Sequence, residues 1–186
     1  MELYLNEIIQ STTKSLKFWE SKDKNHRLLY FQIDPQNDGI PAHFHPLGED
    51  YAIVVDGEML YDISFDTQIT VSENEIAFGW QHFVHGYHNR SNFPLHIIIF
   101  ATPENNPSIY NEVENKTCFD EKVRVQNLTN NFNTMESNFI KFSIVQGDLA
   151  IKNCILYDWQ NKKIIFPTET TEYILNKEGY LQIVFK

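Results

Sequence analysis

The most informative segment of the sequence is GIPAHFHPLGEDYAIVVDG, residues 39–57. It places His43 and His45 two positions apart and the carboxylate of Glu49 four positions further on. Side chains alternate between the faces of a strand, so the two histidines point to the same side. Glu49 shares their parity if the strand resumes after the intervening Pro-Leu-Gly break. This pattern predicts two imidazoles and one carboxylate on one face of a strand.

A second cluster, HFVHGYHN, spans residues 82–89 and carries three more histidines. We assign His85 as the third imidazole, because His88 has the opposite strand parity and His82 falls in the expected turn before the strand. His82 and His88 remain candidate acid–base or catalytic groups, and the alternative is that both face solvent.

The predicted ligand set is therefore His43, His45, Glu49 and His85. Three neutral nitrogens and one carboxylate suit a divalent transition metal such as Fe, Mn, Ni, Co or Zn, although the residue types do not choose among these ions. On a six-coordinate ion they leave two positions open. The alternative is that these histidines are surface or core residues gathered by chance.

Both stretches resemble the sequence motifs of the cupin superfamily, G-x5-H-x-H-x3-E-x6-G and G-x5-P-x-G-x2-H-x3-N. The H-x-H-x3-E core of the first motif is complete in this sequence. Its leading glycine, Gly39, stands two residues closer than the pattern asks, and Gly57 stands one residue further. All the positions that the first motif assigns to metal ligands are kept.

The second motif falls on residues 74–89, where the pair His85-x3-Asn89 is intact. Asn74 takes the place of the leading glycine, an exchange that suits asparagine because it visits the left-handed turn conformation. Trp80 stands at the proline position and His82 at the following glycine position. The resemblance implies an all-β fold, a cupin-type double-stranded β-helix (jelly-roll barrel) that holds the metal inside.

Short strand-like runs separated by turn residues surround both motifs and favour a barrel or sandwich. They are residues 27–33, 50–55, 58–65, 68–71 and 94–102, and runs of the same kind resume between 139 and 186. We therefore expect an N-terminal lead-in over 1–26, a metal-binding barrel over 27–104, a linker over 105–129 and a smaller second β-domain over 130–186.

The second set of runs looks like a reduced copy of the first. IVVDGEML (53–60) and IVQGDLAI (144–151) both place a glycine between an apolar strand and a strand that starts with an acidic residue. When the cupin motif is carried onto this copy, its ligand positions fall on Asn133, Met135, Phe139 and Glu172. These side chains do not suit a divalent ion. We expect a degenerate cupin-like domain without a metal site.

Composition narrows the range of functions. The chain has 186 residues, 42% hydrophobic, with 14 Phe and 9 Tyr, which fits an all-β globular protein. Its formal net charge of −10 argues against nucleic acid and against anionic membrane surfaces as partners. The N-terminal residues have neither a signal-peptide nor a membrane-span pattern, and two cysteines are too few for a disulfide framework. We expect a cytoplasmic protein that pairs as a homodimer.

The resemblance implies an enzyme of the dioxygenase, isomerase, decarboxylase or lyase type that acts on a small oxygenated molecule. The alternative is a non-catalytic module that binds a sugar, an organic acid or another small effector. A third possibility is a storage or structural barrel in which the metal has no functional role. We name five candidate pocket residues, each of which could instead be ordinary core: Tyr51, Tyr61, Tyr87, His96 and Ile98.

Overall fold

The computed structural model describes residues 1–103, 107–110, 124–147, 150–151, 154–166, 173–174 and 179–186. It divides into two compact units: Thr13–Asn127 forms the larger unit, and Met1–Thr12 together with Leu128–Lys186 forms the smaller one. No helix in the described part of the chain is long and apolar enough to cross a membrane.

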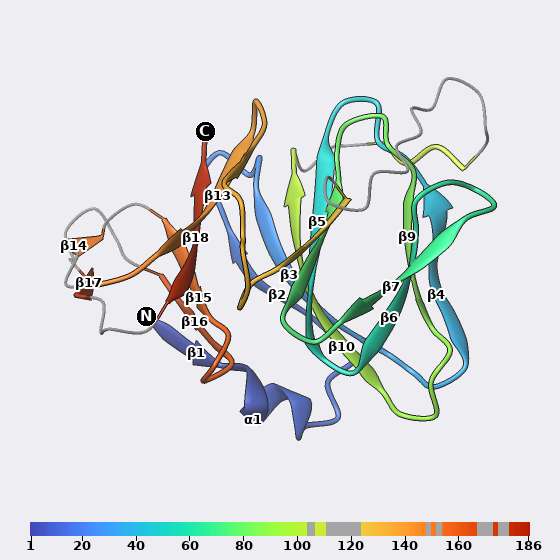
Figure 1. Cartoon of the computed structure of the whole chain (residues 1–186), viewed down its shortest axis with the longest axis horizontal. Helices are drawn as coiled ribbons and strands as arrows, with labels where there is room; N and C mark the ends of the chain where they lie inside the picture. Colours follow the sequence, from blue (N-terminus) through green and yellow to red (C-terminus); the bar gives the residue numbers. More distant parts are fainter. Residues whose placement is uncertain (104–106, 111–123, 148–149, 152–153, 167–172, 175–178) are drawn as a thin grey trace. The chain divides into compact units, whose positions relative to one another are not determined.

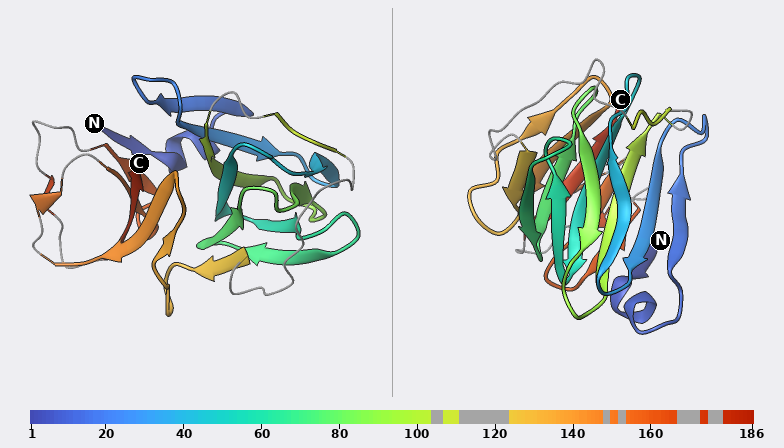
Figure 2. Two further views of the ribbon diagram at one scale, coloured as in Figure 1. Left: turned by 90° about the horizontal axis from the view of Figure 1, so that it is seen from above. Right: turned by 90° about the vertical axis from the view of Figure 1, so that its right-hand side faces the viewer.

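The larger unit is a barrel made of two facing antiparallel sheets (Figure 1). One sheet has the strand order β11-β8-β5-β10-β3-β2, and the other has the order β4-β9-β6-β7. The right-hand view of Figure 2 shows the strands of the four-stranded sheet side by side. The strands are β2 (Ser15–Glu20), β3 (Arg27–Ile33), β4 (Asn37–His43), β5 (Glu49–Asp56), β6 (Glu58–Asp62), β7 (Gln68–Ser72), β8 (Glu75–Gly79), β9 (His85–Asn89), β10 (Leu95–Thr102) and β11 (Val125–Asn127).

Side chains alternate between the two faces of each strand, and the inward-facing ones from both sheets fill the barrel interior. On β5 the inward side chains include Ala52 and Val54, and they pack in one cluster with side chains from the opposite sheet. That cluster consists of Ile33, Ala52, Val54, Met59, Tyr61, Ile63, Val71, Ala77, Tyr87, Leu95, Ile97 and Ile99. Each fully buried large aliphatic side chain contributes about 1.5–3 kcal/mol, so this cluster favours the inward orientation of the strand faces that carry it.

Two irregularities in β4 bring its last residue opposite β9. The register between β4 and β9 shifts twice, between Asn37 and Ile40 and again before His43, which then pairs with His85. Gly39 lies in the first irregular stretch with φ +56, and a Cβ there would lie 2.3 Å from the Tyr87 carbonyl oxygen. A glycine is therefore required where the two strands come this close.

Asn89 at the end of β9 explains the final position of the second motif. Its buried amide donates hydrogen bonds to the carbonyl oxygens of Ile33 at 3.0 Å and Phe93 at 2.8 Å. It thus ties β9 to β3 and to the turn that leads into β10. The expected left-handed conformation of Asn74 is confirmed by its φ of +64.

The smaller unit is also β-rich, with one sheet of order β1-β16-β15-β18-β13-β12 and a separate pair, β14-β17. Gly147 follows β13 with a positive φ, as Gly57 follows β5. Its elements are β1 (Glu2–Tyr4), α1 (Leu5–Ile9), β12 (Met135–Glu136), β13 (Ile140–Val145), β14 (Ala150–Ile151), β15 (Ile155–Asp158), β16 (Lys163–Ile165), β17 (Tyr173–Ile174) and β18 (Tyr180–Phe185).

The units are divided differently from the boundaries expected from the sequence. The expected lead-in splits: β1 pairs with β16 in the smaller unit, whereas β2 pairs with β3 in the barrel. The expected linker contributes β11, which pairs with β8, and its residues 105–106 and 111–123 lie outside the described residues. β4 lies in the interval between the strand-like runs 27–33 and 50–55, where no such run was expected. Glu172 also lies outside the described residues.

Candidate metal centre

Four side chains meet inside the larger unit at the end of β4 and the starts of β5 and β9. His43, His45, Asp50 and His85 each offer one ligand atom, and these atoms all lie within 4.8 Å of one another. The three histidines are almost fully buried. The imidazole rings of His43 and His85 have centroids 4.4 Å apart, and His45 lies 4.8 Å and 5.0 Å from them.

Backbone carbonyls orient all three imidazoles in the same way. The Nδ1 atoms of His43, His45 and His85 donate to the carbonyl oxygens of Pro41 at 2.7 Å, Pro107 at 3.1 Å and Phe83 at 2.9 Å. A carbonyl oxygen only accepts, so each Nδ1 carries the hydrogen, and Nε2 of His43 and of His85 is the atom available to a metal. Nε2 of His45 is hydrogen-bonded to Asp50, so a metal would replace a proton there. This arrangement is how proteins commonly fix the tautomer of metal-binding histidines.

Asp50, rather than the predicted Glu49, brings the carboxylate to the imidazoles. Its Oδ2 lies 3.1 Å from Nε2 of His45 and 3.9 Å from Nε2 of His85. Glu49 instead accepts a hydrogen bond from the Tyr51 hydroxyl on the other face of β5. The prediction assumed that strand parity runs unbroken from His45, but the chain leaves the strand after β4, and β5 begins with a new parity.

Burial and neighbouring charges shift the pKa values of the imidazoles. Burial lowers the pKa of His43, and it holds the pKa of His85 well below its ordinary value with help from the two neighbouring imidazoles. Burial also opposes the charged form of His45, but the hydrogen bond and charge of Asp50 outweigh it and raise the pKa. His43 and His85 are therefore neutral near pH 7, as metal ligands must be.

The donor set fits a divalent transition ion. Nε2 of His85 is fully buried and has no hydrogen-bond partner among the described residues. A buried nitrogen lone pair without a partner is costly, and a cation between three Nε2 atoms and a carboxylate would satisfy it. The cluster could hold a metal through His43, His45, Asp50 and His85.

Two tyrosines and an arginine lie behind the cluster on the inner wall. Tyr87 follows His85 on the same face of β9, with ring centroids 6.0 Å apart, and stacks on Tyr61 at 5.8 Å. Burial raises the pKa of Tyr61 and places that of Tyr87 well above its ordinary value, so both stay protonated. The structure therefore places two of the five predicted pocket residues in the barrel interior.

Arg124, which directly precedes β11, is fully buried in the same interior. Its guanidinium donates to the carbonyl oxygens of Phe78, Ile63 and Val84 and, at 3.1 Å, to the hydroxyl oxygen of Tyr61. Sequence reasoning missed it because it lies beyond a polar stretch, some forty residues from the second motif. What marks it is that a buried arginine with no carboxylate partner among the described residues is rare, and seeing this requires the structure.

The other three predicted pocket residues lie on the opposite face of the six-stranded sheet. Ile97 and Ile99 of β10 belong to the barrel core, so His96 and Ile98 point the other way. His96 Nδ1 lies 2.7 Å from the hydroxyl of Tyr30 on that outer face. The same alternation turns Tyr51 outward from β5, with its ring 5.3 Å from that of Trp80.

The two candidate acid–base histidines also lie outside the cluster. His82 occupies a turn with φ +68, its backbone N–H donates to the carbonyl of His45 at 2.9 Å, and its ring centroid lies 6.4 Å from that of Phe44. His88 points to the outer face of the four-stranded sheet, because it alternates with inward-facing Tyr87. The strand parity expected for His88 is the one observed.

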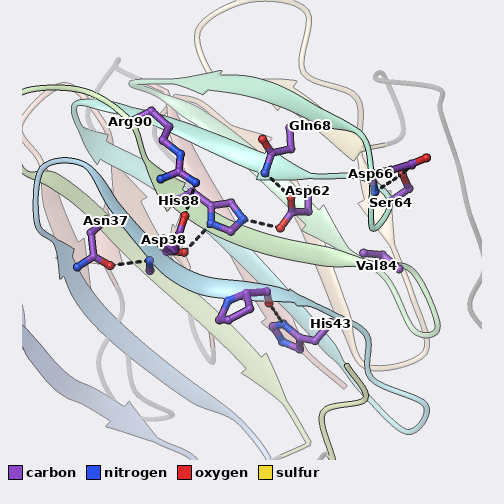
Figure 3. Close-up of polar contacts among 12 residues, drawn as sticks. Asn37, Asp38, His43, Asp62, Ser64, Asp66, Gln68, Val84, His88 and Arg90 are labelled. Atoms are coloured by element: carbon purple, nitrogen blue, oxygen red, sulfur yellow. Dashed lines mark hydrogen bonds and ion pairs between the residues drawn. The ribbon is translucent and has the colours of Figure 1, made fainter. Parts of the chain in front are cut away.

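On that outer face, His88 is held between two strands (Figure 3). Its Nε2 donates to Asp62 on β6 at 2.6 Å, and its Nδ1 donates to the backbone carbonyl of Asp38 on β4. Gln68 donates to the other oxygen of Asp62 at 2.7 Å. Since both ring nitrogens donate, the arrangement favours the imidazolium form, and the hydrogen bond to Asp62 raises the pKa of His88 against the effect of burial.

This buried pair predicts a pH-dependent contribution to stability. Because folding raises the pKa of His88, its ion pair with Asp62 stabilises the folded protein fully at pH values below the unfolded pKa of about 6.5. This stabilisation is lost as the pH rises through the pKa of His88 in the folded protein. The difference in unfolding free energy between wild type and His88→Gln is expected to be largest near pH 6 and to shrink above neutrality. Urea denaturation from about pH 5.5 to 8.5 measures it.

Asp62→Asn is the matched control, because it removes the same charge pair from the other side. It is expected to reduce the same pH dependence. A wild-type-to-variant difference that stays constant over the pH range would mean that His88 acts only through packing.

Comparisons with known proteins agree at the level of the fold. The sequence matches no protein-family model and no curated protein. A cupin 2 conserved barrel domain protein from Leptotrichia buccalis aligns over 100% of this chain and 96% of that chain, with a TM-score of 0.56 and 10% identity. A conserved protein with a double-stranded β-helix domain from Klebsiella pneumoniae covers 55% of this chain and 88% of its own, with a TM-score of 0.46 and 22% identity.

Proposed function

Because the chain has the cupin fold, we propose that it is a metal-dependent enzyme acting on a small oxygenated molecule. One divalent transition ion is held by His43, His45, Asp50 and His85. The observation that carries the proposal is the buried Nε2 of His85, which has no partner among the described residues and faces a carboxylate and two further imidazoles. A metal bound there supplies Lewis acidity or redox chemistry to an oxygen ligand.

The chain's own residues prepare the centre in three ways. The carbonyls of Pro41, Pro107 and Phe83 hold the rings so that no imidazole must reorient on binding. The lowered pKa values of His43 and His85 remove competition from protons near pH 7. Burial of all three rings excludes water and strengthens the electrostatic interactions at the centre.

Metal reconstitution tests the proposal directly. Protein stripped with a chelator and titrated with Fe(II), Mn(II), Co(II), Ni(II) or Zn(II) is expected to bind about one equivalent of at least one ion. Elemental analysis after desalting gives the stoichiometry. The Fe(II) form is then screened for oxygen consumption and for product formation with keto acids, catechols and sugars. Protein that retains none of these ions contradicts the proposal.

A binding module is the second candidate, and one observation favours it. His82 and His88 lie outside the cluster, so in the described part of the chain neither predicted acid–base histidine reaches the centre. A site that orients a ligand without either of these histidines beside it suits an effector-binding barrel. Saturable ligand binding by the metal-loaded protein, with no product detected by mass spectrometry, would favour this function over catalysis.

A further inference from the structure

The hydroxyl of Tyr87 is a buried donor that has no acceptor among the described residues. The residue is 1% exposed, and its oxygen has no hydrogen-bond partner among the described residues. The side chain stands two positions after His85 on the same inward face of β9. An unsatisfied buried hydroxyl costs about 1–3 kcal/mol. Such a group beside a candidate metal centre indicates an acceptor that a ligand supplies.

Tyr61 offers a second hydroxyl hydrogen to the same interior. Its oxygen accepts from Nη2 of Arg124 at 3.1 Å, and in the described part of the chain its own hydrogen has no acceptor. A hydroxyl that accepts from a guanidinium becomes a better donor, because the two hydrogen bonds polarise one another. The stacked rings of Tyr61 and Tyr87 place both donors on the same wall.

The charge of Arg124 lacks a carboxylate partner within the described residues. Within the described residues its hydrogen-bond acceptors are three backbone carbonyls and one hydroxyl, all neutral, and one of its five N–H groups donates to none of them. The guanidinium also lies over the rings of Tyr61 and Phe83, which are neutral as well. A divalent ion with three neutral imidazoles and the carboxylate of Asp50 carries a net charge of +1, which Arg124 raises to +2. Two positive charges in a buried interior favour an anion.

We propose that the ligand of this centre is a small organic carboxylate, one of whose oxygens binds the metal while the other accepts hydrogen bonds from Tyr87 and Tyr61. Arg124 compensates its charge through Tyr61 and through the field of the guanidinium. The inference rests on the proposed metal centre and specifies what that centre binds. It assigns positioning roles to two tyrosines and a charge-compensating role to Arg124.

The test uses cobalt-loaded full-length protein, because the visible spectrum of Co(II) reports on its ligands without any turnover. Acetate is the probe, and acetamide is its neutral counterpart of the same shape. Acetate is expected to change the spectrum saturably, whereas acetamide at equal concentration leaves it unchanged. Tyr87→Phe and Tyr61→Phe are each expected to weaken acetate binding about tenfold or more, as the loss of a hydrogen bond to a charged group does.

Three controls separate the possible failures. Tyr157→Phe removes a buried tyrosine hydroxyl from the smaller unit and is expected to bind acetate as wild type does. Cobalt affinity is expected to be unchanged in Tyr87→Phe. The metal-free Tyr87→Phe protein is expected to melt at the wild-type temperature or higher, because the substitution removes an unsatisfied group; a fall of several degrees would mean that the hydroxyl is structural.

Equal acetate affinity in wild type, Tyr87→Phe and Tyr61→Phe overturns this inference and leaves the metal centre intact. Acetamide that binds as tightly as acetate also overturns it, because charge then plays no part. Wild-type protein that takes up no cobalt overturns both the inference and the proposed function.

Discussion

His85→Ala is expected to lower the affinity for a divalent metal by more than about 100-fold, because even the loss of a group that merely orients a ligand costs 10- to 100-fold. His85 is fully buried, and its Nε2 has no other partner among the described residues. Removing the ring deletes one of the proposed metal ligands. Elemental analysis after reconstitution, with competition against a chelator of known affinity, measures the loss.

His88→Ala is the matched control, since His88 lies on the same strand but faces outward to Asp62. It is expected to leave the metal stoichiometry unchanged. A comparison of Asp50→Asn with Glu49→Gln decides which carboxylate binds the ion. We expect a large loss of affinity for the first and a small one for the second, because Glu49 accepts from Tyr51 on the other face of β5. The reverse order would show that the carboxylate is misassigned.

Arg124→Met is expected to reduce the free energy of unfolding by about 3 kcal/mol, because three buried carbonyls lose a charged donor and each unsatisfied group costs about 1–3 kcal/mol. Methionine keeps much of the apolar bulk of arginine, so the effect reports the guanidinium rather than a cavity. The carbonyls belong to Ile63, Phe78 and Val84, and Val84 directly precedes His85. Urea denaturation measures the change.

Arg90→Met serves as the control, since Arg90 makes an exposed ion pair with Asp38, and such pairs contribute about 0–1 kcal/mol (Figure 3). Its substitution is expected to change stability little. If Arg124→Met proved as stable as wild type, burial of the charge would offset its hydrogen bonds, and the arginine would be retained for binding rather than for folding.

The sequence was sufficient to predict the fold class and the three imidazoles. H-x-H and the spacing from His85 to Asn89 are short local patterns, so recognising them does not depend on a correct prediction of the surrounding loops. The carboxylate could not be placed in the same way, because every residue from Tyr51 to Val55 is buried and the strand therefore shows no polar face from which to read its register. Both faces of β10 are buried as well, so the sequence did not show that His96 and Ile98, which were named as pocket residues, lie on the face away from the barrel interior.

Arg124 illustrates a different limit. A charged residue in a polar stretch is expected at the surface, and only a long-range contact with Tyr61 and the carbonyl of Val84 reverses that expectation. These two contacts join residues 63 and 40 positions apart. No periodicity within a single segment encodes them.

β9 carries two separate chemistries back to back. His85, Tyr87 and Asn89 turn toward the barrel interior, while Gly86 and His88 turn outward, where a Cβ on Gly86 would meet the Asp62 carboxylate at 2.1 Å. A deletion or insertion of one residue in this strand would exchange the two sets, sending the imidazole outward and the imidazolium pair into the interior. A substitution in β9 therefore affects one face of the strand, whereas a change in its length affects both the inward and the outward face.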